Sequence, residues 1–398
     1  MTDETDPISG GLHRALAAGE DAVDRARRVI SNRLERSQPK HIATYAGYSN
    51  RFETHLTGRI LSQTPGGGPL DHDNLWDNLR NTLRRWESDE VAGVELTVDF
   101  EGHQVVVISD EEGYYQATLP AAVGDGMLWR SAEARVVRPD GEITAIHPVL
   151  TPSAAAQFGI ISDLDDTVIH TGITSILLAA KLTFLENAKT RKPLDGVAEL
   201  YSALQKGMAG TPINPLFYVS SSPWNLYDLL WDFIELNDIP RGPILLRDFG
   251  LDSSKFIKEK GHGHKLRKAL AILDGYPELP FVLVGDSGQD DAPIYAELTR
   301  LRPGRVRAIY IRDVDPDQDS DRDKTVHQAV EKAASLGVPM ILAPNSKAMS
   351  EHASRIGLLP AAAVPEVIRE VHRDEERPEP GGQAIRDAAD SLLPEAEP

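Results

Sequence analysis

Two acidic stretches of the sequence have the residue types and spacing for chemistry. Residues 163–167 (DLDDT) hold three carboxylates within four positions, and residues 286–291 (DSGQDD) hold three more. Each stretch is separated by one residue from a preceding apolar run of the size of a buried strand, at 158–161 and at 281–284. Carboxylates this close repel one another unless a cation lies between them, and a cluster of oxygen ligands suits Mg²⁺. Because open α/β sheets place their sites at the carboxyl ends of strands, the two stretches predict one cation site.

The first acidic stretch has a second interpretation. Asp and Thr favour the position before a helix, so residues 163–167 are also typical of an acidic N-cap region. The apolar run before them and the second acidic stretch both count against that interpretation. Asp163 and Asp165 are two positions apart, so both can face a site in the loop above a sheet.

Hydroxyls and one lysine complete the candidate site. The apolar run 216–219 leads into Ser220, Ser221 and Ser222, and a hydroxyl at a strand end can bind a phosphate oxygen. Three serines are also ordinary loop residues, and the sequence leaves open whether Ser220 or Ser221 makes such a contact. Lys265 precedes a helix expected at 266–273, where lysines are usually solvated, but from there it can also reach a bound phosphate as a point charge.

Two histidines near this lysine offer a further metal pair. His262 and His264 are two residues apart, but the sequence supplies no third ligand beside them. We therefore expect both histidines to be exposed loop residues.

Composition excludes several classes of protein. At 398 residues the chain predicts two domains plus tails, and its 41% hydrophobic residues suffice for their cores. With no cysteine, disulfides, thiolate metal sites and cysteine nucleophiles are excluded. The formal charge of −19 argues against a non-specific nucleic-acid binder. No apolar window reaches the length of a membrane span and no signal peptide is evident, so we expect a cytoplasmic protein without a transmembrane segment.

Hydrophobic periodicity and composition divide the chain into four parts. In residues 1–40, apolar positions at helical spacing over 11–37 predict an amphipathic helix. Residues 41–150 show short alternating segments typical of a β-sandwich, interrupted by a predicted helix at 75–87. Residues 151–373 alternate strand, loop and helix, which predicts a parallel sheet flanked by helices. Residues 374–398 are rich in Pro, Glu, Gly and Ala, which predicts a disordered acidic tail.

Within these parts we expect particular elements. The predicted strands are 53–61, 94–98, 104–108, 114–119 and 134–137, then 158–161, 216–219, 244–246, 281–286, 306–311 and 340–342. Further helices are predicted at 175–188, 197–206, 224–236 and 266–273, and residues 313–323 read as a solvated acidic loop.

The order of carboxylates, hydroxyl, lysine and carboxylates resembles the four-motif arrangement of the haloacid dehalogenase superfamily. The segments FGIISDLDDTVIHTG, FYVSSSPWNLYDLL, HKLRKAL and FVLVGDSGQDDAPIY resemble, more narrowly, the actin patch phosphatidate phosphatase family. The resemblance covers about residues 151–360. It implies a Rossmann-like, doubly wound parallel sheet of haloacid dehalogenase type as the catalytic domain, preceded by the β-sandwich.

The resemblance also implies roles for the candidate residues. Asp163 would be the nucleophile that forms an aspartyl-phosphate, and Asp165 would be the general acid and base. Ser220 and Lys265 would hold the phosphoryl oxygens, with Lys265 offsetting the developing charge.

A metal site follows from the same resemblance. Mg²⁺ would be bound by Asp163, by the backbone carbonyl of Asp165, by Asp286 and by a last acid. Both Asp290 and Asp291 are available for that last position, and the family spacing favours Asp291.

The substrate is expected to be large. The expected helices account for most of residues 167–216, and one helix and one strand for most of 221–264, which leaves little chain for a cap. An open site suits a phosphorylated lipid or another large phosphomonoester. The apolar helix predicted from Ser175 has two interpretations, packing against the sheet, which is the more common role of such a helix, and peripheral membrane contact. A Mg²⁺-dependent phosphatidate phosphatase is therefore expected.

Two alternatives remain at this point. A protein or soluble phosphoester phosphatase of the same superfamily would need the same residues. A non-catalytic adaptor binding partners through the β-sandwich would not need to retain Asp163, Asp165, Lys265 and Asp286 together. The sequence does not indicate an oligomeric state.

Overall fold

The computed structural model describes residues 39–62, 90–122, 128–164, 195–247, 262–288, 290–313 and 321–376. The chain divides into two compact units. The first, here called the mixed-sheet unit, comprises Met1–Thr44, Leu56–Thr118 and Ala132–His147. The second, the parallel-sheet unit, comprises Tyr45–His55, Leu119–Ser131 and Pro148–Pro398.

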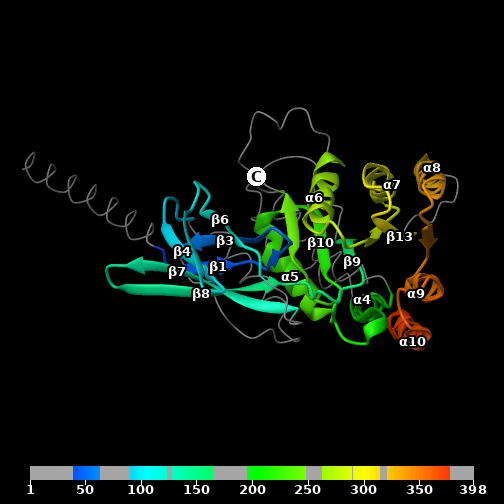
Figure 1. Ribbon diagram of the computed structural model, residues 1–398, viewed down its shortest axis with the longest axis horizontal. Coiled ribbons are helices and arrows are strands. Elements are labelled where there is room, and N and C mark those ends of the chain that lie inside the picture. The colour runs from blue at the N-terminus through cyan, green and yellow to red at the C-terminus, as the bar shows by residue number, and fades with distance from the viewer. Residues whose placement is uncertain are drawn as a thin grey trace, which may run out of the picture. The chain divides into compact units, whose positions relative to one another are not determined.

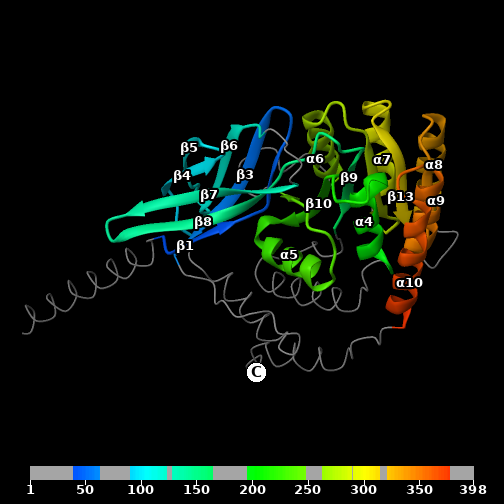
Figure 2. The same ribbon diagram turned by 60° about the horizontal axis from the view of Figure 1, so that its bottom comes forward.

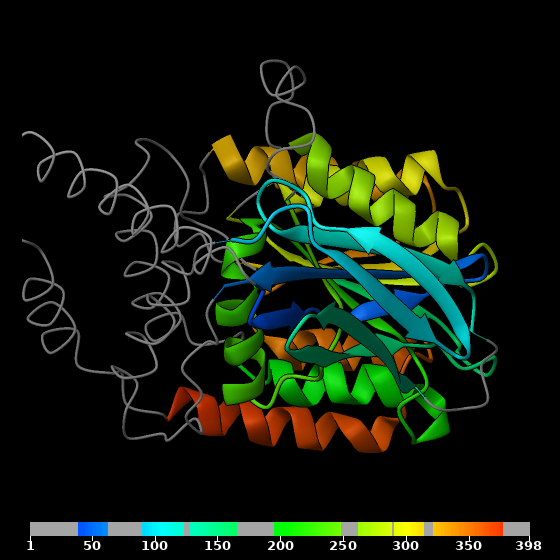
Figure 3. The same ribbon diagram turned by 90° about the vertical axis from the view of Figure 1, so that its left-hand side faces the viewer.

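Eight strands form a curled mixed sheet, which Figure 3 shows from one side. Its pairings include antiparallel neighbours and one parallel pair, β2 with β8, and the order is β1-β3-β2-β8-β7-β4-β5, with β6 pairing β3. The strands are β1 (His41–Thr44), β2 (Gly47–Ser49), β3 (Glu53–Leu61), β4 (Glu95–Phe100), β5 (His103–Ile108), β6 (Tyr114–Pro120), β7 (Trp129–Arg138) and β8 (Gly141–Leu150).

The strands of this sheet alternate between buried and accessible residues. In β4, for example, Leu96, Val98 and Phe100 are at most 1% exposed while the residues between them are half-buried. Alternation is the pattern of a sheet with one face against a core. Inside that core the Tyr115 hydroxyl lies 2.7 Å from His147 Nε2, so both polar groups have a buried partner.

The second sheet is entirely parallel. Its strands lie in the order β11-β10-β9-β12-β13-β14. They are β9 (Gly159–Asp163), β10 (Leu216–Pro223), β11 (Ile244–Arg247), β12 (Phe281–Asp286), β13 (Val306–Arg312) and β14 (Met340–Ala343). Strand β9 lies inside the sheet between β10 and β12, and its first four residues are buried, as a strand covered on both faces requires.

Helices cover both faces of this sheet (Figures 1 and 2). One face packs against α6, α7 and α8, and α4 and α9 contact the other through Tyr201 and His352. The helices are α4 (Val197–Lys206), α5 (Tyr227–Leu236), α6 (His262–Gly275), α7 (Asp291–Leu301), α8 (Asp321–Ser335), α9 (Ser346–Arg355) and α10 (Val364–Glu375), with short 3₁₀ helices η1 (Gly207–Ala209), η2 (Trp224–Leu226) and η3 (Ala361–Ala363). This is the Rossmann-like α/β fold predicted from the sequence.

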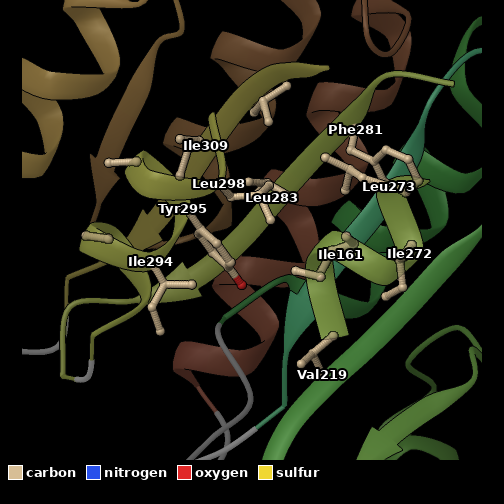
Figure 4. Packing of buried hydrophobic residues seen from close by; sticks show 14 of the residues in the cluster. Ile161, Val219, Ile272, Leu273, Phe281, Leu283, Ile294, Tyr295, Leu298 and Ile309 are labelled. Atoms are coloured by element: carbon tan, nitrogen blue, oxygen red, sulfur yellow. The ribbon is translucent and has the colours of Figure 1, made fainter. Parts of the chain in front are cut away.

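The core on the α6 side is continuous across the sheet. Figure 4 shows Ile161, Leu283 and Ile309 from three neighbouring strands beneath Leu273 of α6 and Leu298 of α7. All five side chains are fully buried. At about 1.5–3 kcal/mol for each such side chain, this packing holds α6 and α7 against the strands whose ends carry the acidic residues.

A segment that contains β2 and the start of β3 belongs to the parallel-sheet unit. The backbone N–H of Ala46 donates a hydrogen bond of 2.7 Å to the Tyr227 hydroxyl. The Tyr276 hydroxyl in turn donates to the carbonyl oxygen of Ser49 over 2.8 Å. The ring of Tyr45 stacks on Trp224 with centroids 5.2 Å apart. Residues 45–55 are therefore part of the unit that contains the parallel sheet.

Most predicted strands and helices within the described residues are present, with small shifts at their ends. The sequence analysis did not identify β1, β2, β8, α7, α9 and α10, and α8 begins at Asp321, inside the stretch predicted as a loop. The predicted helices at 11–37, 75–87 and 175–188, and the tail beyond 376, lie outside the described residues. The prediction of a small cap or none concerns mainly 165–194 and 248–261, which lie outside them too. Among the helices that are described, none is long and apolar enough to cross a membrane.

Candidate active site

The site is built around the end of β9. Asp163 is the last residue of this strand, and its side chain is only 3% exposed. Strands β10 and β12 flank β9, with Val219 opposite Asp163 and Val284 opposite Ser162. The central position of β9 therefore delivers one carboxylate into a protected space at the carboxyl edge of the sheet.

Lys265 of α6 joins two carboxylates. Its Nζ lies 2.7 Å from Asp163 Oδ1 and 3.0 Å from Asp291 Oδ1. The side chains of Lys265 and Asp291 are 7% and 0% exposed. Charges removed from water to this extent are stable only with a partner of opposite sign, so the lysine compensates part of the negative charge of the cluster.

Asp291 begins α7 and is held by backbone as well as by Lys265. Its Oδ2 accepts a hydrogen bond of 3.1 Å from the N–H of Asp286. Gly285 leaves the space for this carboxylate, since a Cβ atom there would lie 2.5 Å from Asp291 Oδ2. Asp290 is the residue before α7, and Asp291 is the one whose carboxylate lies in the cluster.

The donor set fits a divalent cation. One carboxylate oxygen from each of Asp163, Asp286 and Asp291 lies within 4.8 Å of the other two. Three carboxylates against the single ammonium of Lys265 leave an excess of negative charge, and hard cations such as Mg²⁺ prefer oxygen ligands. The cluster therefore suits a metal ion, although the donor atoms do not identify which one. Asp165, predicted as an acid and base and as a ligand, lies outside the described residues.

The serines lie nearer to the sheet than we expected. Strand β10 extends through Pro223, so Ser220 and Ser221 belong to the strand and not to a loop after it. Ser220 is fully buried, and its Oγ accepts a hydrogen bond of 2.9 Å from the N–H of Ser222. Ser221 is half-buried. Which of the two contacts a phosphate stays a prediction.

The expectation of two exposed loop histidines is wrong for His264. Both histidines lie in the first turn of α6, and His264 is 9% exposed. The error arose because the helix was expected to begin only after Lys265. The earlier start places the backbone of His264 and Lys265 in regular helix, and Lys265 is thereby fixed beside Asp163.

A hydroxyl pair behind Asp163 was not identified from the sequence. Ser162 Oγ donates to the carbonyl oxygen of Asp163 over 2.8 Å and lies 2.7 Å from the Tyr201 hydroxyl. Burial raises the pKa of Tyr201 well above its ordinary value, so the hydroxyl stays protonated at neutral pH. The available signal was a serine within an apolar run, and nothing in the spacing connects it with a tyrosine 39 positions away.

Comparison with known proteins points to one family. Residues 158–313 match the family model described as "Phosphatidate phosphatase APP1, catalytic domain". The protein named phosphatidate phosphatase APP1 of Saccharomyces cerevisiae is 34% identical over 155 residues, which cover 39% of this chain and 25% of the yeast protein. An uncharacterized protein of Schizosaccharomyces pombe is 31% identical over 268 residues, 66% of this chain and 41% of its own length.

The matches cover only part of each relative. The chain spans less than half the length of the two curated relatives. Among solved structures, a titin–obscurin-like 1 immunoglobulin complex covers 29% of this chain and 97% of its own at 13% identity, with a TM-score of 0.16 that supports no argument. All four segments that suggested the resemblance lie within residues 158–313 or at its edges. Residues 158–313 therefore match the family of APP1 phosphatidate phosphatase catalytic domains, the family that the sequence motifs resemble.

Proposed function

We propose that the chain is a Mg²⁺-dependent phosphomonoester hydrolase that converts phosphatidate to diacylglycerol and phosphate. The observation that supports this most directly is the buried cluster in which Lys265 bridges Asp163 and Asp291 beside Asp286. A carboxylate nucleophile, a cation and a set of oxygen ligands in one place are what phosphoryl transfer through an acyl phosphate requires.

In the first step Asp163 attacks the phosphorus atom. A bond forms between a carboxylate oxygen of Asp163 and phosphorus, the bond from phosphorus to the lipid oxygen breaks, and Asp165 gives its proton to the departing alkoxide. Lys265, 2.7 Å from Asp163 Oδ1, offsets the charge that develops on the phosphoryl oxygens. A hydroxyl of Ser220 or Ser221 orients the same oxygens.

In the second step Asp165, now a carboxylate, takes a proton from water. The water oxygen bonds to phosphorus, the bond from phosphorus to Asp163 breaks, and phosphate leaves. Asp163, Asp286, Asp291 and the backbone carbonyl of Asp165 would hold Mg²⁺, which when bound neutralises part of the negative charge around the phosphoryl group.

The proposed substrate is a phosphate displayed on a lipid surface. Little chain is available for a cap, so binding energy would come from the phosphate and its surroundings and not from enclosure. The net charge of −19 opposes approach to anionic bilayers, so membrane contact would be peripheral and apolar, from a cytoplasmic protein. Lipid activity should then depend only weakly on added salt.

Phosphate release from the purified full chain tests the proposal. The panel contains phosphatidate in nonionic mixed micelles, a phosphoprotein, and sugar and nucleotide phosphates, each with Mg²⁺ or with excess chelator. We expect release that needs the cation and is most efficient with phosphatidate. Full activity in chelator would refute the metal requirement, and a clear preference for one small phosphate would make a soluble-phosphoester phosphatase the better assignment.

Variants of the two leading aspartates separate their roles. Asp163→Asn should abolish turnover and leave the fold intact, since the amide keeps the shape but is no nucleophile. Asp165→Asn should let phosphate transfer to Asp163 from an activated aryl phosphate and then stall hydrolysis, which is measured as one equivalent of released phenol per site. Near wild-type steady rates in both variants would show that the roles are wrongly assigned.

A further inference from the structure

The carbonyl group of Asp163 is held by a side-chain relay. Ser162 has one hydroxyl proton, and it is donated to the Asp163 carbonyl oxygen at 2.8 Å. The contact of 2.7 Å between Ser162 Oγ and the Tyr201 hydroxyl must then be donated by Tyr201. The relay runs from Tyr201 through Ser162 to the peptide group that joins Asp163 to Leu164.

This peptide group is where β9 ends and the loop of the active site begins. Orientation of the peptide after Asp163 sets the direction in which the chain leaves the strand, and with it the backbone from which the Asp163 carboxylate projects. Ser162 and Tyr201 are 1% and 5% exposed, so their hydroxyls are largely shielded from water, which strengthens hydrogen bonds.

The helix that carries Tyr201 is itself fixed at its start. The N–H of Gly196, just before α4, donates to Asp374 Oδ2 at 2.9 Å, and the N–H of Glu199 donates to Glu370 Oε2 at 2.7 Å. Both carboxylates come from α10, and both satisfy N–H groups that a helix start leaves without intrahelical partners. The relay is therefore anchored at both ends, on β9 and on a capped helix.

We propose that Tyr201 is a positioning residue for the reaction, which acts through Ser162 to hold the Asp163 backbone in the orientation for attack on phosphorus. The inference rests on the proposed function. A positioning residue changes the rate of the chemical step and leaves substrate binding unchanged, because it touches neither the phosphate nor the lipid.

A second tyrosine supplies a matched control. Tyr218 is fully buried on β10, lies opposite Ser162 in the sheet, and has its ring 6.5 Å from that of Tyr201. Its hydroxyl donates to the carbonyl oxygen of Pro240 over 2.7 Å, a contact that does not involve Asp163. Tyr218→Phe therefore removes one buried tyrosine hydrogen bond on the same face of the sheet without breaking the relay.

The experiment measures kcat, KM and the urea midpoint for the wild type, Y201F, S162A, Y218F and the Y201F/S162A double variant. We expect Y201F and S162A each to lower kcat about tenfold with KM within twofold, since one buried hydrogen bond is worth about this factor. The double variant should be no slower than S162A, because both substitutions break one relay. Y218F should lose similar stability but keep kcat within twofold.

Several outcomes would overturn the inference. Equal kcat in Y201F and Y218F would show that the hydroxyls serve stability alone. A change confined to KM would place the effect on substrate binding, and additive losses in the double variant would show that the two hydroxyls do not act through one relay; either result would overturn the inference. If Y201F does not fold, the comparison of S162A with Y218F decides the same question. A wild type that releases no phosphate from any substrate refutes the proposed function and the inference with it, whereas an active wild type with unaffected variants refutes the inference alone.

Discussion

The two sheets of this protein use polar residues in opposite ways. In the mixed sheet, buried polar groups face one another in the interior, as Tyr115 and His147 do, and stabilise the unit. In the parallel sheet the buried polar groups of the strand interiors are uncharged hydroxyls such as that of Ser162, and the carboxylates are placed where strands β9 and β12 end. The difference teaches that an edge at which several strands stop can gather like charges that no strand interior tolerates.

The largest loss of activity and stability should come from removing the ammonium group of Lys265 at this edge. Lys265→Met leaves Asp163 and Asp291 buried without their shared partner, so activity should fall at least about a hundredfold and the free energy of unfolding by about 3–5 kcal/mol. Added Mg²⁺ should restore part of the stability in urea titrations, because it supplies the missing positive charge.

An exposed lysine on the same unit is the control. Lys332 pairs with Glu297 at 2.8 Å, and its side chain is 43% exposed. Lys332→Met should change the free energy of unfolding by less than about 1 kcal/mol and leave turnover unchanged. Equal losses in the two lysine variants would mean that the cluster at the edge is an ordinary ion pair.

A pair of glycine substitutions compares the two sheets directly. Gly285→Ala would bring a Cβ atom to 2.5 Å from Asp291 Oδ2, and Gly58→Ala would bring one to 2.4 Å from the Tyr115 hydroxyl. Both should destabilise by about 1–3 kcal/mol through overpacking. Only G285A should also lower kcat, by about tenfold or more, because it displaces a carboxylate of the site. A similar loss of kcat per folded molecule in G58A would contradict the contrast between the sheets.

A milder test concerns the buried pair of the mixed sheet. Tyr115→Phe removes the hydroxyl that lies 2.7 Å from His147, so the free energy of unfolding should fall by about 1–3 kcal/mol. Turnover of the folded protein should not change. A specific loss of kcat at temperatures where the variant is fully folded would assign a catalytic role to the mixed sheet.

The smallest effect on stability is expected for the surface residue Glu297, and it should depend on pH. Hydrogen bonds from Arg300 and Lys332 lower the pKa of Glu297 to about 2, below the ordinary value near 4.5. Because the folded-state pKa is depressed, its stabilisation is complete above pH 4.5 and is lost as the pH falls toward 2. Glu297→Gln should cost less than about 1 kcal/mol at pH 7, and its difference from wild type in urea midpoint should shrink between pH 5 and pH 3. A difference that grows on acidification would have the wrong sign.

Much of the parallel sheet could be predicted because its physical cause is local. Strands such as β12 are unbroken apolar runs that end in acid, and the sequence displays both features. Helix α8 was harder to identify, since its buried residues Val326, Ala329 and Ala333 are small and its other positions are largely charged. Such a weak apolar stripe gives little periodic signal in the sequence. It is nevertheless enough to hold a helix that packs against the apolar face of a sheet.

The site could be predicted in its residue types but not in its contacts. The role of Lys265 toward a phosphate stays a prediction. Its contacts with Asp163 and Asp291 were not predicted, and they depend on where α6 starts and how it packs. Tyr201 reaches Ser162 only because α4 crosses the sheet beside β9. Such contacts are set by tertiary packing, which the spacing of residues along the sequence does not show.

The place of residues 45–55 has a consequence for biosynthesis. Ser49 leaves the ribosome early, but its carbonyl accepts a hydrogen bond from Tyr276, which is synthesised 227 positions later. The N–H of Ala46 likewise donates to Tyr227, which follows 181 positions later. Between Ser49 and Tyr276, the ribosome must synthesise the remaining six strands of the mixed sheet, β3 to β8. The parallel-sheet unit therefore cannot close during translation until about residue 276 has emerged, which leaves its earliest segment dependent on a late partner and slow to be buried.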